Sequence, residues 1–190
     1  MEINTWSKTL LTIYNQLEKI TEAIDNLVLT RAINSHNYNT NNEVLYVADK
    51  IINLTQRKIK LINLKVLVDK VLNKMDKEEA KILILKYLYE FNTEKLMESL
   101  GVKERSIFRK INEAIVSFST ICEKYGFNSE KLYDTYKDEG WIIEVYNTIA
   151  IQSCRTGRPG NVNFFDEAFL NRIYRSYKKP PQILSIVINS

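Results

Sequence analysis

A strict seven-residue repeat of apolar side chains near the amino end constrains the fold more than any other feature. The apolar positions alternate at spacings of three and four residues over 3–27: Ile3, Trp6, Leu10, Ile13, Leu17, Ile20, Ile24 and Leu27. Because an α-helix turns about 100° per residue, this spacing gathers them into one stripe along a helix. The stripe is typical of a bundle helix, or of the seam of a coiled-coil-like hairpin or dimer, and the sequence leaves both open.

Glycine and proline are scarce, which favours an all-α fold. The 190 residues include five glycines and three prolines, whereas sheet-rich chains need turn residues about every ten positions. A polar break at 35–42 separates the first helix from a second, expected over 43–75. We predict three regions: a long helical hairpin for assembly over 1–75, a set of shorter helices over 76–126, and a small helical extension over 127–190.

The second expected helix is strongly basic. Residues 50–74 include seven basic side chains and a single acid, Asp69. A charged helix face usually does no more than contact solvent. The more specific alternative is that these side chains bind nucleic-acid phosphates. The sequence alone leaves both interpretations open.

The segment from Asn92 to Ile115 reads as two helices joined by a tight turn. Asp76 is the expected cap of the preceding helix, over 78–91, and Asn92 can cap the next one. Gly101 can end that helix because glycine tolerates the left-handed backbone of such turns. Apolar residues on both sides supply the packing between the helices: Leu96, Leu100, Val102, Ile107, Ile111, Ala114, Ile115 and Phe118. This is the pattern of a helix-turn-helix, whose second helix lies in the major groove of DNA. We therefore predict that the middle region, 76–126, is a helix-turn-helix domain.

The outward face of the second of these helices is rich in side chains that contact DNA. Arginine can bind guanine through two hydrogen bonds, asparagine can bind adenine, and phenylalanine can contact the thymine methyl group. We expect Arg105 and Arg109 to read base edges, and Lys103 and Lys110 to hold phosphates. The candidate DNA-binding residues of this helix are Lys103, Arg105, Ser106, Phe108, Arg109, Lys110 and Asn112.

Residues 67–126 resemble region 4 of sigma-70-type factors and the sigma-like regulators of phages and plasmids. The resemblance rests on KILILKY at 81–87, an acid-containing helix at 94–100, LGVK at 100–103, and the run from Ile107 through Ala114 to Phe118. It implies a sequence-specific transcription regulator whose partners are double-stranded DNA and RNA polymerase. The alternative is a protein-binding adaptor of RNA polymerase or another factor, with the same fold but without DNA reading.

Three departures from the family pattern bear on this expectation. Met97 stands where the family has a small residue, which would separate the two helices. Lys103 replaces the usual serine cap, so the first N–H groups of the second helix are left for water or phosphate. Glu104 and Glu113 would repel phosphate unless they pair with Lys or Arg. Residues 1–75 also lack the aromatic-rich DNA-melting segment of a full sigma factor, so we expect a stand-alone regulator that forms a homodimer through the helices of 3–75.

A second candidate contact is the Gly-Arg-Pro sequence at 157–159. It resembles the core of AT-hook peptides, in which arginine enters the narrow minor groove of A/T-rich DNA while proline keeps the backbone extended. Arg158 would insert into the groove and Arg155 would contact a phosphate. An ordinary turn in a surface loop explains the same three residues, so this alternative stays open.

Other function classes find little support in the sequence. The single histidine, His36, lies in a polar stretch with no nucleophile placed around it, and there is no phosphate-binding glycine loop or metal-binding motif. We therefore expect no enzymatic activity, no cofactor and no metal. Cys122 and Cys154 fit no metal or disulfide pattern, and no signal or membrane-spanning segment is evident, so we expect a cytoplasmic protein.

Overall fold

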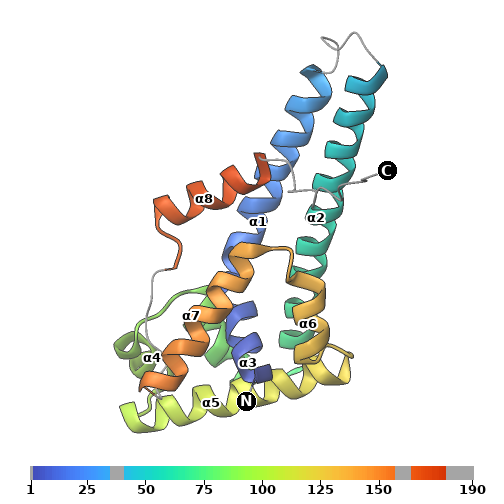
Figure 1. The fold of residues 1–190 in the computed structure, drawn as a ribbon. Helices are drawn as coiled ribbons and strands as arrows, with labels where there is room; N and C mark the ends of the chain where they lie inside the picture. Colours follow the sequence, from blue (N-terminus) through green and yellow to red (C-terminus); the bar gives the residue numbers. More distant parts are fainter. Residues whose placement is uncertain (1, 35–40, 157–163, 179–190) are drawn as a thin grey trace. The chain divides into compact units, whose positions relative to one another are not determined.

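The computed structural model describes residues 2–34, 41–156 and 164–178, and all regular structure among them is helical, as predicted (Figure 1). The elements are α1 (Glu2–Asn34), α2 (Asn41–Lys74), α3 (Lys77–Leu83), the π-helical segment η2 (Ile84–Leu88), α4 (Thr93–Leu100), α5 (Glu104–Lys124), α6 (Ser129–Tyr136), α7 (Gly140–Thr156) and α8 (Glu167–Lys178). Within these ranges no helix has an apolar stretch long enough to cross a bilayer.

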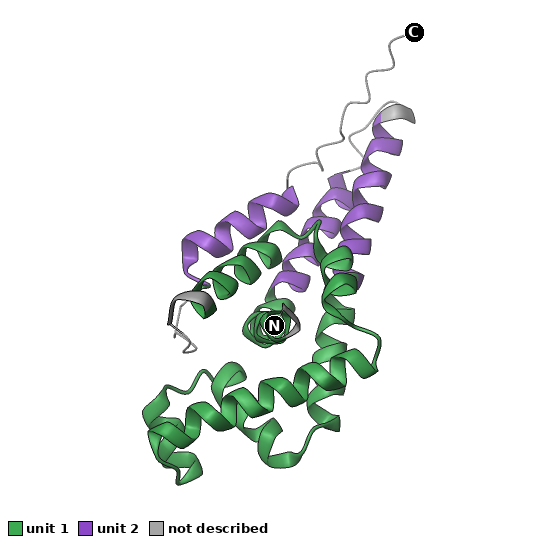
Figure 2. Cartoon of the chain, turned by 60° about the horizontal axis from the view of Figure 1, so that its bottom comes forward, with its two compact units in different colours: residues 1–19, 60–164 green, residues 20–59, 165–190 purple. Residues whose placement is uncertain are grey.

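The chain divides into two compact units (Figure 2). Unit 1 comprises residues 1–19 and 60–164, and unit 2 comprises residues 20–59 and 165–190. Helices α3 to α7 belong to unit 1 and α8 belongs to unit 2, whereas α1 and α2 each contribute to both. The three regions expected from the sequence are consecutive, whereas each of these units combines segments that lie far apart in the chain.

The heptad stripe of α1 is buried within the chain, as the apolar repeat predicts. In unit 1 and unit 2 its central members are at most 1% exposed, namely Trp6, Leu10, Ile13, Leu17, Ile20 and Ile24. Leu27 is partly buried, and the side chain of Ile3 lies outside the described ones. Because the chain's own side chains cover the stripe, α1 does not offer it as a seam between two molecules.

Polar contacts join α1 to α2 in unit 1. Glu18 forms an ion pair with Lys65 at 2.8 Å, and Tyr14 Oη donates to Asp69 Oδ1 at 2.6 Å. From the first contact to the second, the residue number on α1 decreases by four while the residue number on α2 increases by four. The two helices are therefore antiparallel there. Burial and the bond to Asp69 raise the pKa of Tyr14 to about 12.

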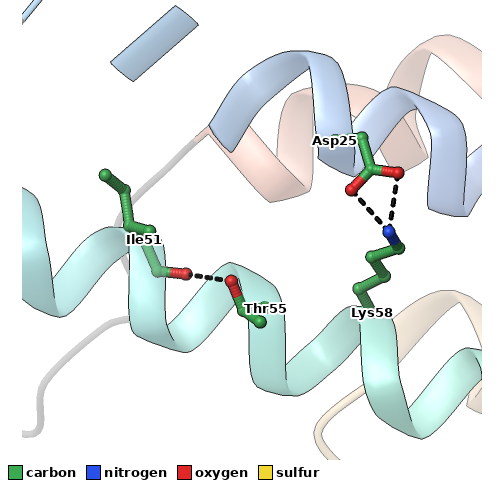
Figure 3. A network of polar contacts seen from close by, with 4 residues as sticks. All are labelled: Asp25, Ile51, Thr55 and Lys58. Atoms are coloured by element: carbon green, nitrogen blue, oxygen red, sulfur yellow. Dashed lines mark hydrogen bonds and ion pairs between the residues drawn. The ribbon is translucent and has the colours of Figure 1, made fainter. Parts of the chain in front are cut away.

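The basic run of α2 takes part in packing inside unit 2. Lys58 Nζ lies 2.6 and 2.7 Å from the two carboxylate oxygens of Asp25 on α1 (Figure 3). The Arg57 guanidinium lies 4.0 Å from the centroid of the Tyr177 ring on α8, a cation–π contact. These contacts favour the structural interpretation of the basic run over a phosphate-binding face.

The carboxyl half of α5 is anchored to the start of α1 in unit 1. Ser119 Oγ lies 2.8 Å from Ser7 Oγ and 2.7 Å from Asn4 Oδ1, and the first of these contacts is buried. Beside it, the Trp6 and Tyr146 rings lie 4.7 Å apart between centroids. One side of this half of α5 is therefore part of the core, while its other side, with Val116 and Thr120, is exposed.

Candidate nucleic-acid interface

The helix α3 begins where the sequence predicts and ends earlier than expected. Asp76 Oδ1 accepts hydrogen bonds from the backbone N–H groups of Glu78 and Glu79 at 2.9 and 3.4 Å, so it caps the helix. The expectation of one continuous helix over 78–91 is wrong, because α3 changes to the π-helical segment η2 at Ile84 and this segment ends at Leu88. A π-helical turn holds one extra residue and is often found at functional positions.

An unusual backbone at Glu90 ends this helical run. Glu90 has φ of 55°, the left-handed region that residues other than glycine seldom adopt. The N–H of Phe91 then bonds back to Leu85 O at 2.9 Å, and Asn15 Nδ2 of α1 donates to Leu88 O at 2.7 Å. The Asn15 side chain thus provides a hydrogen-bond donor for the carbonyl of Leu88 at the helix end, where carbonyl groups have no partner within the helix. Neither Asn15 nor Glu90 was expected from the sequence to shape this region.

The turn between α4 and α5 has the geometry predicted for it. Asn92 Oδ1 accepts from Lys95 N at 2.9 Å and caps α4. Gly101 adopts φ 62° and ψ 32°, and its N–H bonds to Met97 O. Val102 N also donates to Met97 O at 3.2 Å, which completes a Schellman-type helix end. The predicted roles of Asn92 and Gly101 are thus confirmed.

One face of α5 is packed against the rest of unit 1. The residues expected to form this face, Ile107, Ile111, Ala114, Ile115 and Phe118, are at most 1% exposed, and Leu96 of α4 is fully buried. Both α3 and α4 contact α5. The predicted inner face is therefore confirmed, and it fixes which residues of α5 point outward.

Three of the candidate DNA-reading residues share the exposed face of α5. Arg105, Arg109 and Asn112 are exposed, and Val116 continues the same face toward the carboxyl end. Lys103 precedes the first residue of α5, is exposed, and makes no side-chain capping bond, as expected from the missing serine. The amino end of α5 therefore combines uncapped N–H groups with basic side chains.

The other three candidates lie at the border of this face. Ser106, Phe108 and Lys110 are partly buried rather than outward-facing. The expectation of an exposed Phe108 is therefore wrong. At about 100° per residue, positions 108 and 110 fall on the two sides of the buried row that includes Ile107 and Ile111.

Acidic side chains occupy the middle of the exposed face. Arg109 Nη1 forms an ion pair with Glu113 Oε1 at 3.1 Å, and Ser117 Oγ donates to Glu79 Oε1 of α3 at 3.0 Å. These residues, with Asn112 and Val116, line an open groove between α3 and α5. Two carboxylates in this groove oppose the approach of phosphate, whereas the basic side chains of Lys103 and Arg105 at the amino end of α5 favour it.

The remaining candidate positions fall elsewhere. Arg158 and His36 lie outside the described residues, and so does the side chain of Arg155. Burial raises the pKa of the Cys122 thiol to about 12, with a smaller effect of Glu123, so the thiol stays protonated and is a poor nucleophile. Among the described side chains no cluster of three or more His, Cys, Asp or Glu residues has the arrangement of a metal site.

Comparison with known proteins assigns no family to the chain. No family model, no curated protein and no solved structure matches the chain.

Proposed function

We propose that this protein is a sequence-specific DNA-binding transcription regulator in which α4, the Gly101 turn and α5 act as a helix-turn-helix. The observation that carries the proposal is the exposed amino half of α5. Lys103, Arg105, Arg109 and Asn112 are exposed there, while the opposite face of the same helix is buried. In helix-turn-helix proteins the amino-terminal residues of the second helix contact base edges in the major groove.

The local charge supports contact with DNA through the amino half of α5. Residues 103–113 include four basic and two acidic side chains. One of the acids, Glu113, already pairs with Arg109 within the helix, so it repels phosphate less than a free carboxylate would. The positive end of the α5 dipole and its uncapped N–H groups add to the attraction for phosphate at Lys103.

Selection of bound duplexes from a random pool, followed by fluorescence anisotropy at two salt concentrations, tests the proposal. Arg105→Ala should weaken binding to the selected site by about 1–3 kcal/mol and affect random DNA less. Lys103→Ala should weaken both about equally and reduce the salt slope by about one. Lys124→Ala, at the exposed far end of the same helix, should change neither. Equal losses from Arg105→Ala on selected and random DNA would refute base reading by Arg105.

A second candidate is a protein-binding adaptor that does not read DNA. The observation that favours it is the charge balance of residues 76–126, which hold nine basic and nine acidic side chains. A neutral region lacks the excess of basic residues that usually provides affinity for the DNA backbone. Failure to bind any duplex at low salt, combined with binding to purified RNA polymerase, would select this alternative.

A further inference from the structure

A second heptad stripe lies on α2, and the structure leaves it exposed. The residues that form it are spaced three and four apart: Leu45, Ala48, Ile52, Thr55, Ile59, Ile62 and Val66. All seven are exposed, and the five large aliphatic side chains are between 41% and 63% exposed. This is the pattern of a coiled-coil seam, but its apolar side chains contact solvent.

The stripe lies on the side of α2 opposite to the residues that pack inside the chain. The buried row of α2 includes Val47, Leu54, Leu61 and Val68, which lie on the other side of the helix at about 100° per residue. Polar bonds mark a further side, because Lys58 reaches Asp25 on α1 (Figure 3). The stripe is thus free of the contacts that hold α2 in the fold.

Thr55 does not interrupt the apolar character of the stripe. Its hydroxyl donates to Ile51 O of the preceding turn at 2.8 Å, as Figure 3 shows. The hydroxyl is therefore satisfied within its own helix, and the methyl group can pack against an apolar partner. A row of exposed aliphatic side chains of this length is typical of an interaction surface, whereas single exposed apolar residues are not.

We propose that the stripe binds the same stripe of a second copy of this chain, with the two α2 helices antiparallel. The side chains that flank it decide the partner and the direction. Asp49, Gln56, Asn63 and Lys70 recur every seven residues along one edge of the stripe. All are exposed, and neither Asp49 nor Lys70 forms an ion pair with a described residue.

The antiparallel arrangement makes this edge complementary to itself. When Asp49 faces Lys70 of the second copy, Gln56 faces Asn63 of the second copy, and two-fold symmetry repeats each pair. In the same alignment the apolar layers join Ile52 to Ile62, Thr55 to Ile59 and Ala48 to Val66 of the second copy. Opposite charges therefore meet at both ends of this edge, and the three apolar layers pair isoleucine with isoleucine, threonine with isoleucine and alanine with valine.

A parallel alignment is less favourable. In parallel two-stranded coiled coils, the residues at one edge of a seam pair with those five positions further along the other edge of the partner. Lys65 would then face Lys70 of the second copy, and no pair would join opposite charges. All of these residues lie on one uninterrupted helix, so their order along its surface follows from α2 itself. The inference is independent of DNA binding.

Sedimentation of the full-length protein over a concentration series tests the dimer. The wild type should associate to a dimer. Ile59→Glu should give a monomer, since it would place two carboxylates in the apolar seam. The control is Ile151→Glu, at an equally exposed aliphatic position on α7, which should remain dimeric. Circular dichroism should show unchanged helix content in both. A wild type that stays monomeric at every concentration would overturn the proposal.

Charge reversal tests the direction of the helices. Asp49→Lys alone and Lys70→Asp alone each turn two attractive pairs into two repulsive ones, and each should raise the dimer dissociation constant by about tenfold. The double variant, Asp49→Lys with Lys70→Asp, should restore the wild-type constant because the pairs are reversed but still opposite in charge. A double variant no tighter than the single variants would overturn the antiparallel pairing.

Discussion

Replacing Gly101 with alanine isolates the contribution of the left-handed backbone to the turn between α4 and α5. Gly101 has φ of 62° and ψ of 32°, and a Cβ atom added there meets no atom within 4 Å. The change therefore creates no clash, and its effect arises from the backbone alone. A side chain in the left-handed region costs about 1–2 kcal/mol. The lower entropy of the unfolded chain offsets about 0.4–1 kcal/mol of this. We expect a net loss of about 1 kcal/mol in the free energy of unfolding.

Gly140→Ala is the matched control. Gly140 is the first residue of α7, and a Cβ there also meets no atom within 4 Å. Because its backbone is helical, only the effect on the unfolded chain remains, and alanine should stabilise the protein by about 0.4–1 kcal/mol. The two variants make the same chemical change in equally open surroundings, and they should shift stability in opposite directions.

Urea denaturation followed by far-UV circular dichroism measures both effects, and thermal unfolding provides a second readout. For a chain of this size, about 1 kcal/mol corresponds to a change of about 2–4 °C in Tm. If Gly101→Ala were as stable as Gly140→Ala, the turn would not need a left-handed residue, and the account of the helix end given above would be wrong.

Two further changes test other parts of unit 1. Ser119→Ala should lower the free energy of unfolding by roughly 1–3 kcal/mol, since it removes the bonds to Ser7 and Asn4. Its exposed neighbour Thr120 bonds only within its own helix, so Thr120→Ala should stay within about 0.5 kcal/mol of wild type in the same denaturation assay. The raised pKa of Tyr14 gives stability that is fully present below pH 10.0 and is lost as pH rises toward about 12. Tyr14→Phe should therefore show a smaller loss of stability across this alkaline range, and an unchanged loss would refute the assignment.

Local signals in the sequence predicted the helix ends and the buried faces. Asp76 and Asn92 cap helices because their side chains reach backbone groups two or three residues away, and Gly101 ends one through its own backbone. The burial of Trp6 and Ile107 follows from helical periodicity. Features of this kind depend on neighbours in the chain, so a single sequence is enough to find them.

Features that depend on distant parts of the chain were not predicted. The segment from Ile82 to Leu88 is apolar except for Lys86 and has no glycine or proline, so it reads as a continuous helix. Its change to η2 accompanies a contact from Asn15, more than seventy positions earlier in the chain. The same limit applies to the two heptad stripes. Periodicity shows that a stripe exists, but only the tertiary structure shows that the stripe of α1 is buried and that the stripe of α2 is exposed.

Ser119 ties α5 to the first turns of α1, and the buried row from Ile107 to Phe118 holds the rest of the helix against unit 1. About 14 residues separate Ser119 from Arg105, which is roughly 20 Å along a helix that rises about 1.5 Å per residue. Because α5 is packed along this whole length, a shift of its contact with α1 would have to move the helix as one rigid body. A change in the first turns of α1 would in this way reach the exposed Arg105 without touching it.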